Sequence, residues 1–412
     1  MMMKRKKSML MAALVMTAIV CTTSTSCSRE LTQEKYLEKV LANVEKIKVA
    51  EYETTEKVKA PYEKKWNRIR QDKITEHDNP ADTTLGFSCV EDVKAEKRVL
   101  VYDGTLAVTV NDNDKTVTVK DFQDKQSKLL PFRLYGPPFF NYVKSLMRYM
   151  LTTTDSIQLV REETEEDYIY KLNIYEDQQV EFFGRDYKVP RPSFFLSEED
   201  GYSFYTLWIR KADAMPYRYL REMSHNVQDI TCYLTSWSDQ PAKEPIVATD
   251  HIPKEGYEVH FVGKEEQKKK GPSVEERLVG KPAPDWTLKD IDGKEVSLKG
   301  LRGKPTIINL TGLGCGPCAL SYPELVEMSK RFNVVSIEAW GNKVQSLIDY
   351  VEHHKITYPF LPGNEDVLNA YVDGNRGVPV YFYLDKNHVI QKVDRGYKLG
   401  MIGQSVKALG WE

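Results

Sequence analysis

The spacing of hydrophobic residues differs between the two halves of the chain. At 31–47 apolar residues recur at every third or fourth position, which predicts one amphipathic helix. From Gly86 to about Trp237 they alternate with polar residues instead, as at 168–174, and turn signals such as Asp103-Gly104 separate the runs. We therefore expect a first half that is mainly antiparallel sheet.

Beyond residue 300 the pattern is that of alternating strands and helices. Strands are expected at 306–310 and 333–340, helices at 317–331 and 344–354, and a closing pair of strands at 380–384 and 389–393. Such an alternation predicts an α/β sheet domain.

A charged stretch separates the two patterns. Residues 263–277 read GKEEQKKKGPSVEER and hold too few apolar side chains to form a core. The chain has 412 residues, which is more than one hydrophobic core usually organises. We therefore predict two domains joined by a linker at 263–277: an α+β domain on an antiparallel sheet at 28–262, and an α/β domain at 278–412.

The overall charge and hydropathy exclude two classes of protein. The 58 Lys and Arg residues against 60 Asp and Glu give a formal net charge of −2, so there is no broad basic field for nucleic acid. The mean hydropathy is −0.50 and the one long apolar run lies at the N-terminus, which excludes a membrane protein with several spans.

The N-terminal segment has the order of a secretory signal. A basic stretch at 4–7 precedes an apolar run at 9–20 and then small polar residues, and Cys27 follows. The run is shorter than the roughly 20 residues of a spanning helix, so a retained span is the weaker alternative. The arrangement resembles a bacterial lipoprotein signal at 1–27, which implies acylation of Cys27. Cys21 is a competing site, and ordinary secretion is the other alternative. We thus expect a body tethered to a membrane of the cell envelope, on its periplasmic side.

Two of the six cysteines, Cys315 and Cys318, have the C-x-x-C spacing, between a predicted strand and a predicted helix. There the first cysteine faces the free N–H groups and positive dipole end of the helix, which lowers its pKa from about 8.5 toward about 7. Cys315 is therefore the expected nucleophile, and Cys318 the residue that resolves the mixed disulfide.

Zinc binding and a purely structural disulfide are alternative roles for this pair. Zinc would need further ligands, yet there is no second C-x-x-C, and His353 and His354 are adjacent rather than spaced by three to five. A structural bridge would close a very small loop and would constrain the unfolded chain little. We predict no metal and no cofactor.

Several segments beside the cysteines resemble the thioredoxin-like domain of membrane-tethered thiol-disulfide oxidoreductases of the TlpA type, related to the AhpC/TSA family. The likeness covers 278–412: residues 279–286 (VGKPAPDW) resemble the family's opening segment, 292–298 its early hairpin, and 377–385 its cis-proline loop and last hairpin. It implies a thioredoxin fold in which an extended client segment pairs beside a cis-proline.

The same resemblance implies the residues of the site. The catalytic set is Cys315, Cys318 and Pro379, and the substrate-binding set is Gly316, Pro317 and Val378.

Three positions near the cysteines bear on their chemistry. Gly314 stands where Trp is usual, and Ser321 stands where many relatives have a Glu implicated in proton handling. Asn309 matches the tethered family rather than thioredoxins themselves, which have a buried Asp. Proton transfer from Cys318 would then fall to water or to a carboxylate such as Glu338 that the fold brings near.

The residues between and before the cysteines bear on the direction of the reaction. The dipeptide Gly316-Pro317 is that of reducing thioredoxins, which favours a reductant. A peroxidase would need a Thr three residues before its cysteine, whereas Thr311 lies four before Cys315.

A weaker likeness concerns the first half. Tyr102-Asp103-Gly104 and residues 207–218 resemble strand ends of LolA-type lipoprotein carriers, which implies a half-barrel with a helix across its concave face. Its interior would accept acyl chains or a hydrophobic partner segment. Aromatic residues that suit this lining, or equally an ordinary core, are Phe132, Tyr135, Phe139, Phe140 and Tyr142.

The two remaining cysteines, Cys89 and Cys232, both lie in predicted strands. In an oxidising compartment they form either a bridge across a long loop or two buried free thiols.

Together these features predict an extracytoplasmic, lipid-anchored thiol-disulfide oxidoreductase that exchanges the Cys315–Cys318 dithiol with disulfides of client proteins. A reductant outside the cytoplasm needs an electron donor, for which we expect a membrane thiol relay. The alternative is a lipid- or partner-binding carrier lipoprotein in which the redox domain serves as an adaptor. The intact C-G-P-C and Val378-Pro379 favour the oxidoreductase.

Overall fold

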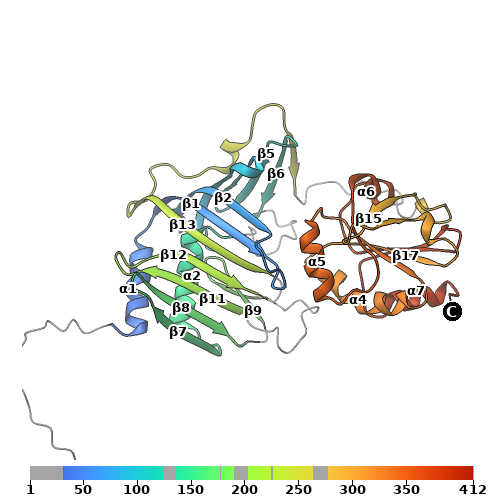
Figure 1. The fold of residues 1–412 in the computed structure, drawn as a ribbon. Coiled ribbons are helices and arrows are strands. Elements are labelled where there is room, and N and C mark those ends of the chain that lie inside the picture. The colour runs from blue at the N-terminus through green and yellow to red at the C-terminus, as the bar shows by residue number, and fades with distance from the viewer. Residues whose placement is uncertain are drawn as a thin grey trace, which may run out of the picture.

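The computed structural model describes residues 31–123, 136–176, 178–189, 203–223, 226–262 and 277–411. A large curved sheet with two helices comes first, and a smaller sheet with helices on both faces follows (Figure 1). Among these residues no helix combines the length and the apolar character needed to cross a membrane.

Several predictions concern residues outside this described part. They are the signal at 1–27 with Cys21 and Cys27, nearly all of the linker at 263–277, and the aromatic residues Phe132 and Tyr135.

The first sheet contains twelve strands in the order β14-β6-β5-β4-β3-β2-β1-β13-β12-β11-β8-β7. Neighbours pair antiparallel, apart from the parallel pair of β14 and β6. The predicted antiparallel sheet is confirmed, and within the described residues it is open, with β14 and β7 at its edges. The bounds are β1 Val49–Lys59, β2 Arg68–Asp78, β3 Phe87–Val93, β4 Arg98–Tyr102, β5 Leu106–Asn111, β6 Thr116–Asp121, β7 Ile157–Glu163, β8 Asp167–Ile174, β11 Ser203–Arg210, β12 Met215–Glu222, β13 Val227–Ser238 and β14 Glu258–Phe261, with a separate hairpin of β9 Gln179–Phe182 and β10 Asp186–Val189.

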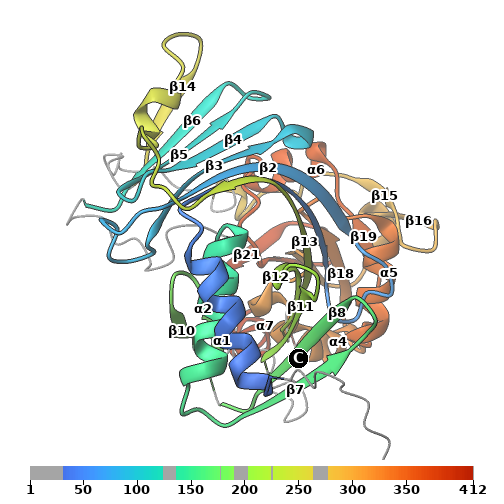
Figure 2. The same ribbon diagram turned by 90° about the vertical axis from the view of Figure 1, so that its left-hand side faces the viewer.

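Two helices, α1 (Gln33–Glu45) and α2 (Phe139–Thr152), lie under the arch of this sheet (Figure 2). A carboxylate from β2 fixes where α2 begins: Glu76 accepts hydrogen bonds from the backbone N–H groups of Phe140 (3.1 Å) and Asn141 (2.7 Å). A negative charge is favourable at this end of a helix because it faces free N–H groups and the positive end of the dipole.

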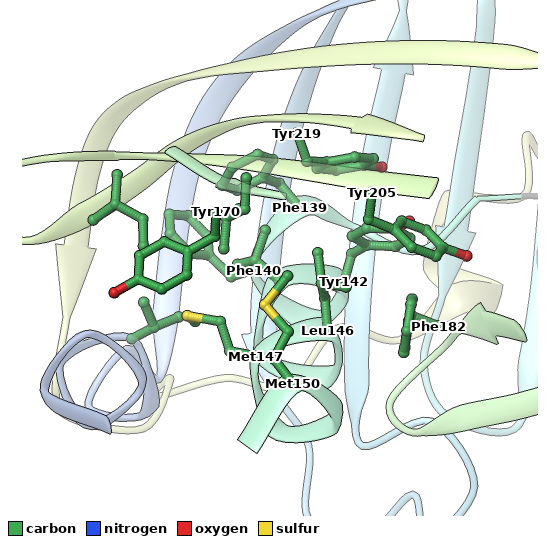
Figure 3. Close-up of a cluster of buried hydrophobic side chains, with 14 of the residues drawn as sticks. Phe139, Phe140, Tyr142, Leu146, Met147, Met150, Tyr170, Phe182, Tyr205 and Tyr219 are labelled. Atoms are coloured by element: carbon green, nitrogen blue, oxygen red, sulfur yellow. The ribbon is translucent and has the colours of Figure 1, made fainter. Parts of the chain in front are cut away.

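The core of the first half lies between α2 and the sheet, as Figure 3 shows. The ring of Tyr142 stacks on Tyr219 with 4.0 Å between centroids, and Phe139 stacks on the same tyrosine at 5.8 Å. Phe139, Phe140 and Tyr142 are thus core residues, and Phe139 also lines a cavity.

Cys89 and Cys232 are two buried free thiols. Cys89 lies in β3 and Cys232 in β13, with β2 and β1 between them. Three strand spacings amount to about 14 Å, whereas a disulfide needs Cα atoms within about 7 Å. The bridge that the sequence left open is therefore not formed.

The second sheet has the order β19-β18-β17-β20-β21, with parallel pairs among β19, β18 and β17 and antiparallel pairs beyond. Its central strand β17 is fully buried, because helices cover both faces of the sheet. The bounds are β15 Thr287–Lys289, β16 Glu295–Ser297, β17 Thr306–Thr311, α4 Gly316–Ser329, β18 Asn333–Glu338, α5 Val344–His353, β19 Phe360–Pro362, α6 Glu365–Val372, β20 Val380–Leu384, β21 Ile390–Arg395 and α7 Met401–Ala408.

The two halves touch at the connection between β1 and β2. Tyr62 of this connection stacks on the ring of His353 at 5.0 Å and meets the edge of Tyr350 at 5.3 Å, both on α5. Beside it, the Lys343 Nζ donates to the backbone oxygen of Asn67 at 3.2 Å. The tip of the β1–β2 hairpin therefore packs against the second half.

Candidate active site

The paired cysteines lie where the central strand of the second sheet passes into a helix. Cys315 and Cys318 form a disulfide, with Cα atoms 5.2 Å apart, at the start of α4. Cys315 is 8% exposed and Cys318 is 0% exposed. Only the first sulfur is therefore open to attack from outside.

Cys315 is the N-cap residue of α4. Its sulfur accepts a hydrogen bond from the Cys318 backbone N–H at 3.3 Å. In the reduced protein, this N–H group and the helix dipole favour a thiolate over a thiol at Cys315.

The cis-proline loop lies against the same sulfur. The peptide bond between Val378 and Pro379 is cis, as the resemblance implied, and the carbonyl oxygen of Val378 is 3.8 Å from the Cys315 sulfur. On its far side, the Pro379 carbonyl accepts from the N–H of Gly396 at 2.8 Å. The structure thus brings together the six residues expected at the site, namely Cys315, Gly316, Pro317, Cys318, Val378 and Pro379, whose individual roles remain predictions.

The backbone before Cys315 explains why the usual Trp is absent. The Cys315 N–H donates to the carbonyl of Gly312 at 3.2 Å, which closes a tight turn. Gly314, in the third position of this turn, has φ +75°, a conformation that costs an L side chain about 1–2 kcal/mol. No atom lies within 4 Å of a Cβ built at Gly314, so the requirement for glycine comes from the backbone alone.

Glu338 is the candidate proton acceptor from the sequence, and its hydrogen bonds all lie within the loop that follows it. Its buried carboxylate accepts from the backbone N–H groups of Trp340 (2.9 Å), Gly341 (2.9 Å) and Asn342 (3.1 Å), and from the Asn342 side chain (2.9 Å). These four bonds occupy both carboxylate oxygens. Glu338 therefore fixes the loop after β18.

The two polar positions beside the cysteines are also buried and locally bonded. The Ser321 hydroxyl donates to the Cys318 carbonyl at 2.7 Å, and the Asn309 amide donates to the Ser336 hydroxyl at 3.0 Å.

Within the described residues no group of three or more His, Cys, Asp or Glu side chains could hold a metal ion.

Sequence reasoning missed two residues at this edge of the sheet, Trp340 and Gly312. The indole N–H of Trp340 donates to the carbonyl of Arg376 at 2.9 Å, beside the cis-proline loop. A Cβ built on Gly312 would lie 2.5–2.7 Å from three atoms of the indole, so the ring rests directly on that glycine. The only sequence signal was an aromatic residue at the predicted end of a strand.

A second candidate region lies on the concave face of the first sheet. A cavity of about 580 Å³ is lined by Ile74, Phe139, Tyr219 and Ile230 together with charged side chains. The charged part is centred on Arg70, which contacts the carboxylates of Glu91 (2.9 Å), Asp72 (2.7 Å) and Glu56 (3.2 Å). The expectation of an apolar interior is therefore only half met.

Comparison with known proteins assigns the second half. The AhpC/TSA family matches residues 279–393. The thiol-disulfide oxidoreductase ResA of Geobacillus thermodenitrificans is 32% identical over 123 residues, which cover 29% of this chain and 70% of that protein. ResA of Bacillus subtilis is 27% identical over 146 residues, covering 34% and 74%. A crystal structure of a thioredoxin-family thiol:disulfide interchange protein from Chlorobium tepidum TLS is 24% identical and aligns with 31% of this chain and 94% of its own, with a TM-score of 0.28. On the strength of its second half, this chain belongs to the AhpC/TSA family and is a thiol-disulfide oxidoreductase.

Proposed function

We propose that the protein is an extracytoplasmic, lipid-anchored oxidoreductase that reduces disulfides of client proteins. The observation that supports this most directly is the placement of the Cys315 sulfur. It caps the helix that carries the buried Cys318, and it lies 3.8 Å from the carbonyl beside the cis-proline. A nucleophile, a resolving thiol and a backbone edge for an extended client thus meet at one sulfur.

The proposed cycle begins with the reduced pair. The Cys315 thiolate attacks one sulfur of a client disulfide. The client S–S bond breaks, a mixed disulfide forms, and the second client sulfur leaves as a thiolate that takes up a proton. The Cys318 thiolate, whose proton passes to water, then attacks the Cys315 sulfur. The mixed disulfide breaks, the first client sulfur leaves and is protonated, and the Cys315–Cys318 disulfide forms.

Each turnover gives the client two electrons and two protons. A thiol donor must then supply two electrons and two protons to the oxidised protein to regenerate its dithiol. A membrane thiol relay is the proposed donor. The disulfide in the structure corresponds to the oxidised state of this cycle. The sequence Gly316-Pro317 between the cysteines supports the reducing direction.

The proposed location depends on the N-terminal pattern. The basic residues, the apolar run and Cys27 support export and acylation there. The predicted acyl chains would hold the oxidoreductase at a membrane surface, where it would meet a membrane-bound donor.

The alternative of a carrier concerns the first half, and there the cavity favours a polar occupant. An acyl chain placed beside Arg70, Glu56 and Asp72 would remove water from these charges without replacing its hydrogen bonds. We therefore propose that the first half is a module for binding a polypeptide segment, and that it presents clients to the redox pair.

The reduction potential of the Cys315–Cys318 pair tests the reducing direction. It is measured on the protein lacking residues 1–27, by equilibration in graded thiol buffers. A value near that of thioredoxin, about −270 mV, supports a reductant that depends on an upstream donor. A value near about −120 mV would instead make the protein an oxidant.

Exchange with clients is tested separately, by reduction of a protein disulfide substrate. The Cys315→Ser variant should be inactive. An unchanged rate in that variant would remove the proposed role of the nucleophile.

A further inference from the structure

Trp340 is a large, partly uncovered side chain at the edge of the redox site. It leaves 41% of its surface exposed, although an indole ring is favourable to bury. Its ring rests on Gly312, and its N–H is bonded to the carbonyl of Arg376. The indole therefore bridges the turn that leads to Cys315 and the loop that leads to the cis-proline.

The surrounding residues hold this ring in place. Glu338 anchors the backbone of residues 340–342 through three N–H groups, so the loop cannot readily swing away. The lack of a side chain at Gly312 allows the ring to approach the backbone. Gly314 leaves open the space where a preceding Trp would stand. The aromatic surface at this edge of the site is thus supplied from the loop after β18 rather than from the residue before Cys315.

The short distance between Gly312 and Cys315 indicates which client side chain the Trp340 indole can contact. Gly312 and Cys315 are the first and last residues of a tight turn, whose Cα atoms lie within about 7 Å. In an extended client segment, residues two apart also lie about 7 Å apart and point to the same side. A side chain two residues from a client cysteine bonded to Cys315 would therefore be within reach of the indole.

We propose that Trp340 is a specificity-determining residue that binds an apolar side chain two positions from the client cysteine. This inference rests on the proposed function, because it assumes that Cys315 exchanges with client disulfides. It names the substrate class: an extended segment in which a Leu or aromatic residue flanks the reactive cysteine. One aromatic contact of this kind corresponds to a preference of roughly two- to tenfold over a polar side chain.

The test compares peptide disulfides that differ at one residue. Two peptides carry Leu or Ser two positions from the cysteine on both sides, and kcat/KM is measured for the wild type, Trp340→Ala and Trp340→Phe. The matched control is Trp237→Ala, because Trp237 is an exposed tryptophan (50%) on β13 of the first half. A small aliphatic disulfide without flanking residues reports the basal exchange rate.

The expected result is a preference for Leu in the wild type, Trp340→Phe and Trp237→Ala that disappears in Trp340→Ala. Each preference is a ratio of two kcat/KM values within one variant, so a change in the basal rate of Trp340→Ala, which the small disulfide reports, cancels from it. An undiminished preference in Trp340→Ala overturns the proposal. So does a wild type that reduces both peptides equally. If the wild type exchanges no disulfide at all, the proposed function has failed instead.

Discussion

Removal of the Tyr62 ring should uncouple the two halves while leaving each core intact. The ring contacts His353 at 5.0 Å, Tyr350 at 5.3 Å and His354 at 6.2 Å. Aromatic pairs contribute about 0.5–1.5 kcal/mol each beyond the area that they bury. Tyr62 is only partly buried and lies on a loop, so we expect Tyr62→Ala to weaken the contact between the two halves by about 2 kcal/mol. That is about a 30-fold increase in the population with separated halves.

Hydrogen exchange of the α5 amides measures this population, since separation exposes the face of α5 that Tyr62 covers. Exchange along 344–353 should accelerate in Tyr62→Ala and stay near the wild-type rate in Tyr62→Phe, which keeps the ring. The control is Lys64→Ala. The Lys64 Nζ lies 3.9 Å from the Glu352 carboxylate, and the two side chains are 79% and 73% exposed, so this ion pair contributes little. Equal exchange in Tyr62→Ala and the wild type would refute the docking of the hairpin tip.

Four further results are expected. Cys318→Ser should accumulate a thiol-sensitive mixed disulfide with clients, seen as a heavier band on a non-reducing gel, because the resolving sulfur is missing. Gly314→Ala should lower the free energy of unfolding by about 1–2 kcal/mol in urea, because φ there is +75° and no neighbour obstructs a methyl group. Burial lowers the pKa of His354 to about 4, from 6.5 in the unfolded chain, so its contribution is complete above pH 6.5 and is lost as the pH falls toward 4. Because of His354, the free energy of unfolding measured in urea should be lower at pH 5 than at pH 7 by at most about 2 kcal/mol. Replacement of His354 by Gln should reduce that difference. Alkylation of the denatured, non-reduced protein should label both Cys89 and Cys232, because they are free thiols.

Local patterns were sufficient to predict most of the second half. The strand at 306–311 holds Ile307, Ile308 and Leu310 and is buried at every position. The helix at 344–353 has the three-and-four spacing of apolar residues, because one of its faces packs in the core. The sequence pattern did not predict the helix α2 at Phe139–Thr152. Ten of its 14 residues are buried, so almost no polar face marks its period.

Features set by strand register could not be read from the sequence. The separation of Cys89 from Cys232 depends on two intervening strands that lie elsewhere in the chain. The sequence offers Glu338 as a carboxylate that the fold could bring near the cysteines. Whether it was available as a proton acceptor depended on the three N–H groups that follow it. The indole on Gly312 likewise joins residues 28 positions apart, and their contact depends on the parallel pairing of β17 and β18.

One hairpin connects the cavity of the first half to the redox domain. Its strand β2 carries Arg70 and Asp72, which both line the cavity. The tip of the same hairpin holds Tyr62 against Tyr350 of α5, and Tyr350 meets Tyr322 of the cysteine-bearing helix at 5.7 Å. The hairpin, and then the contacting rings of Tyr62, Tyr350 and Tyr322, thus connect the proposed client cavity to α4. Because Tyr62 is the link between the two bodies in this path, any effect of a cavity occupant on cysteine reactivity should vanish in Tyr62→Ala.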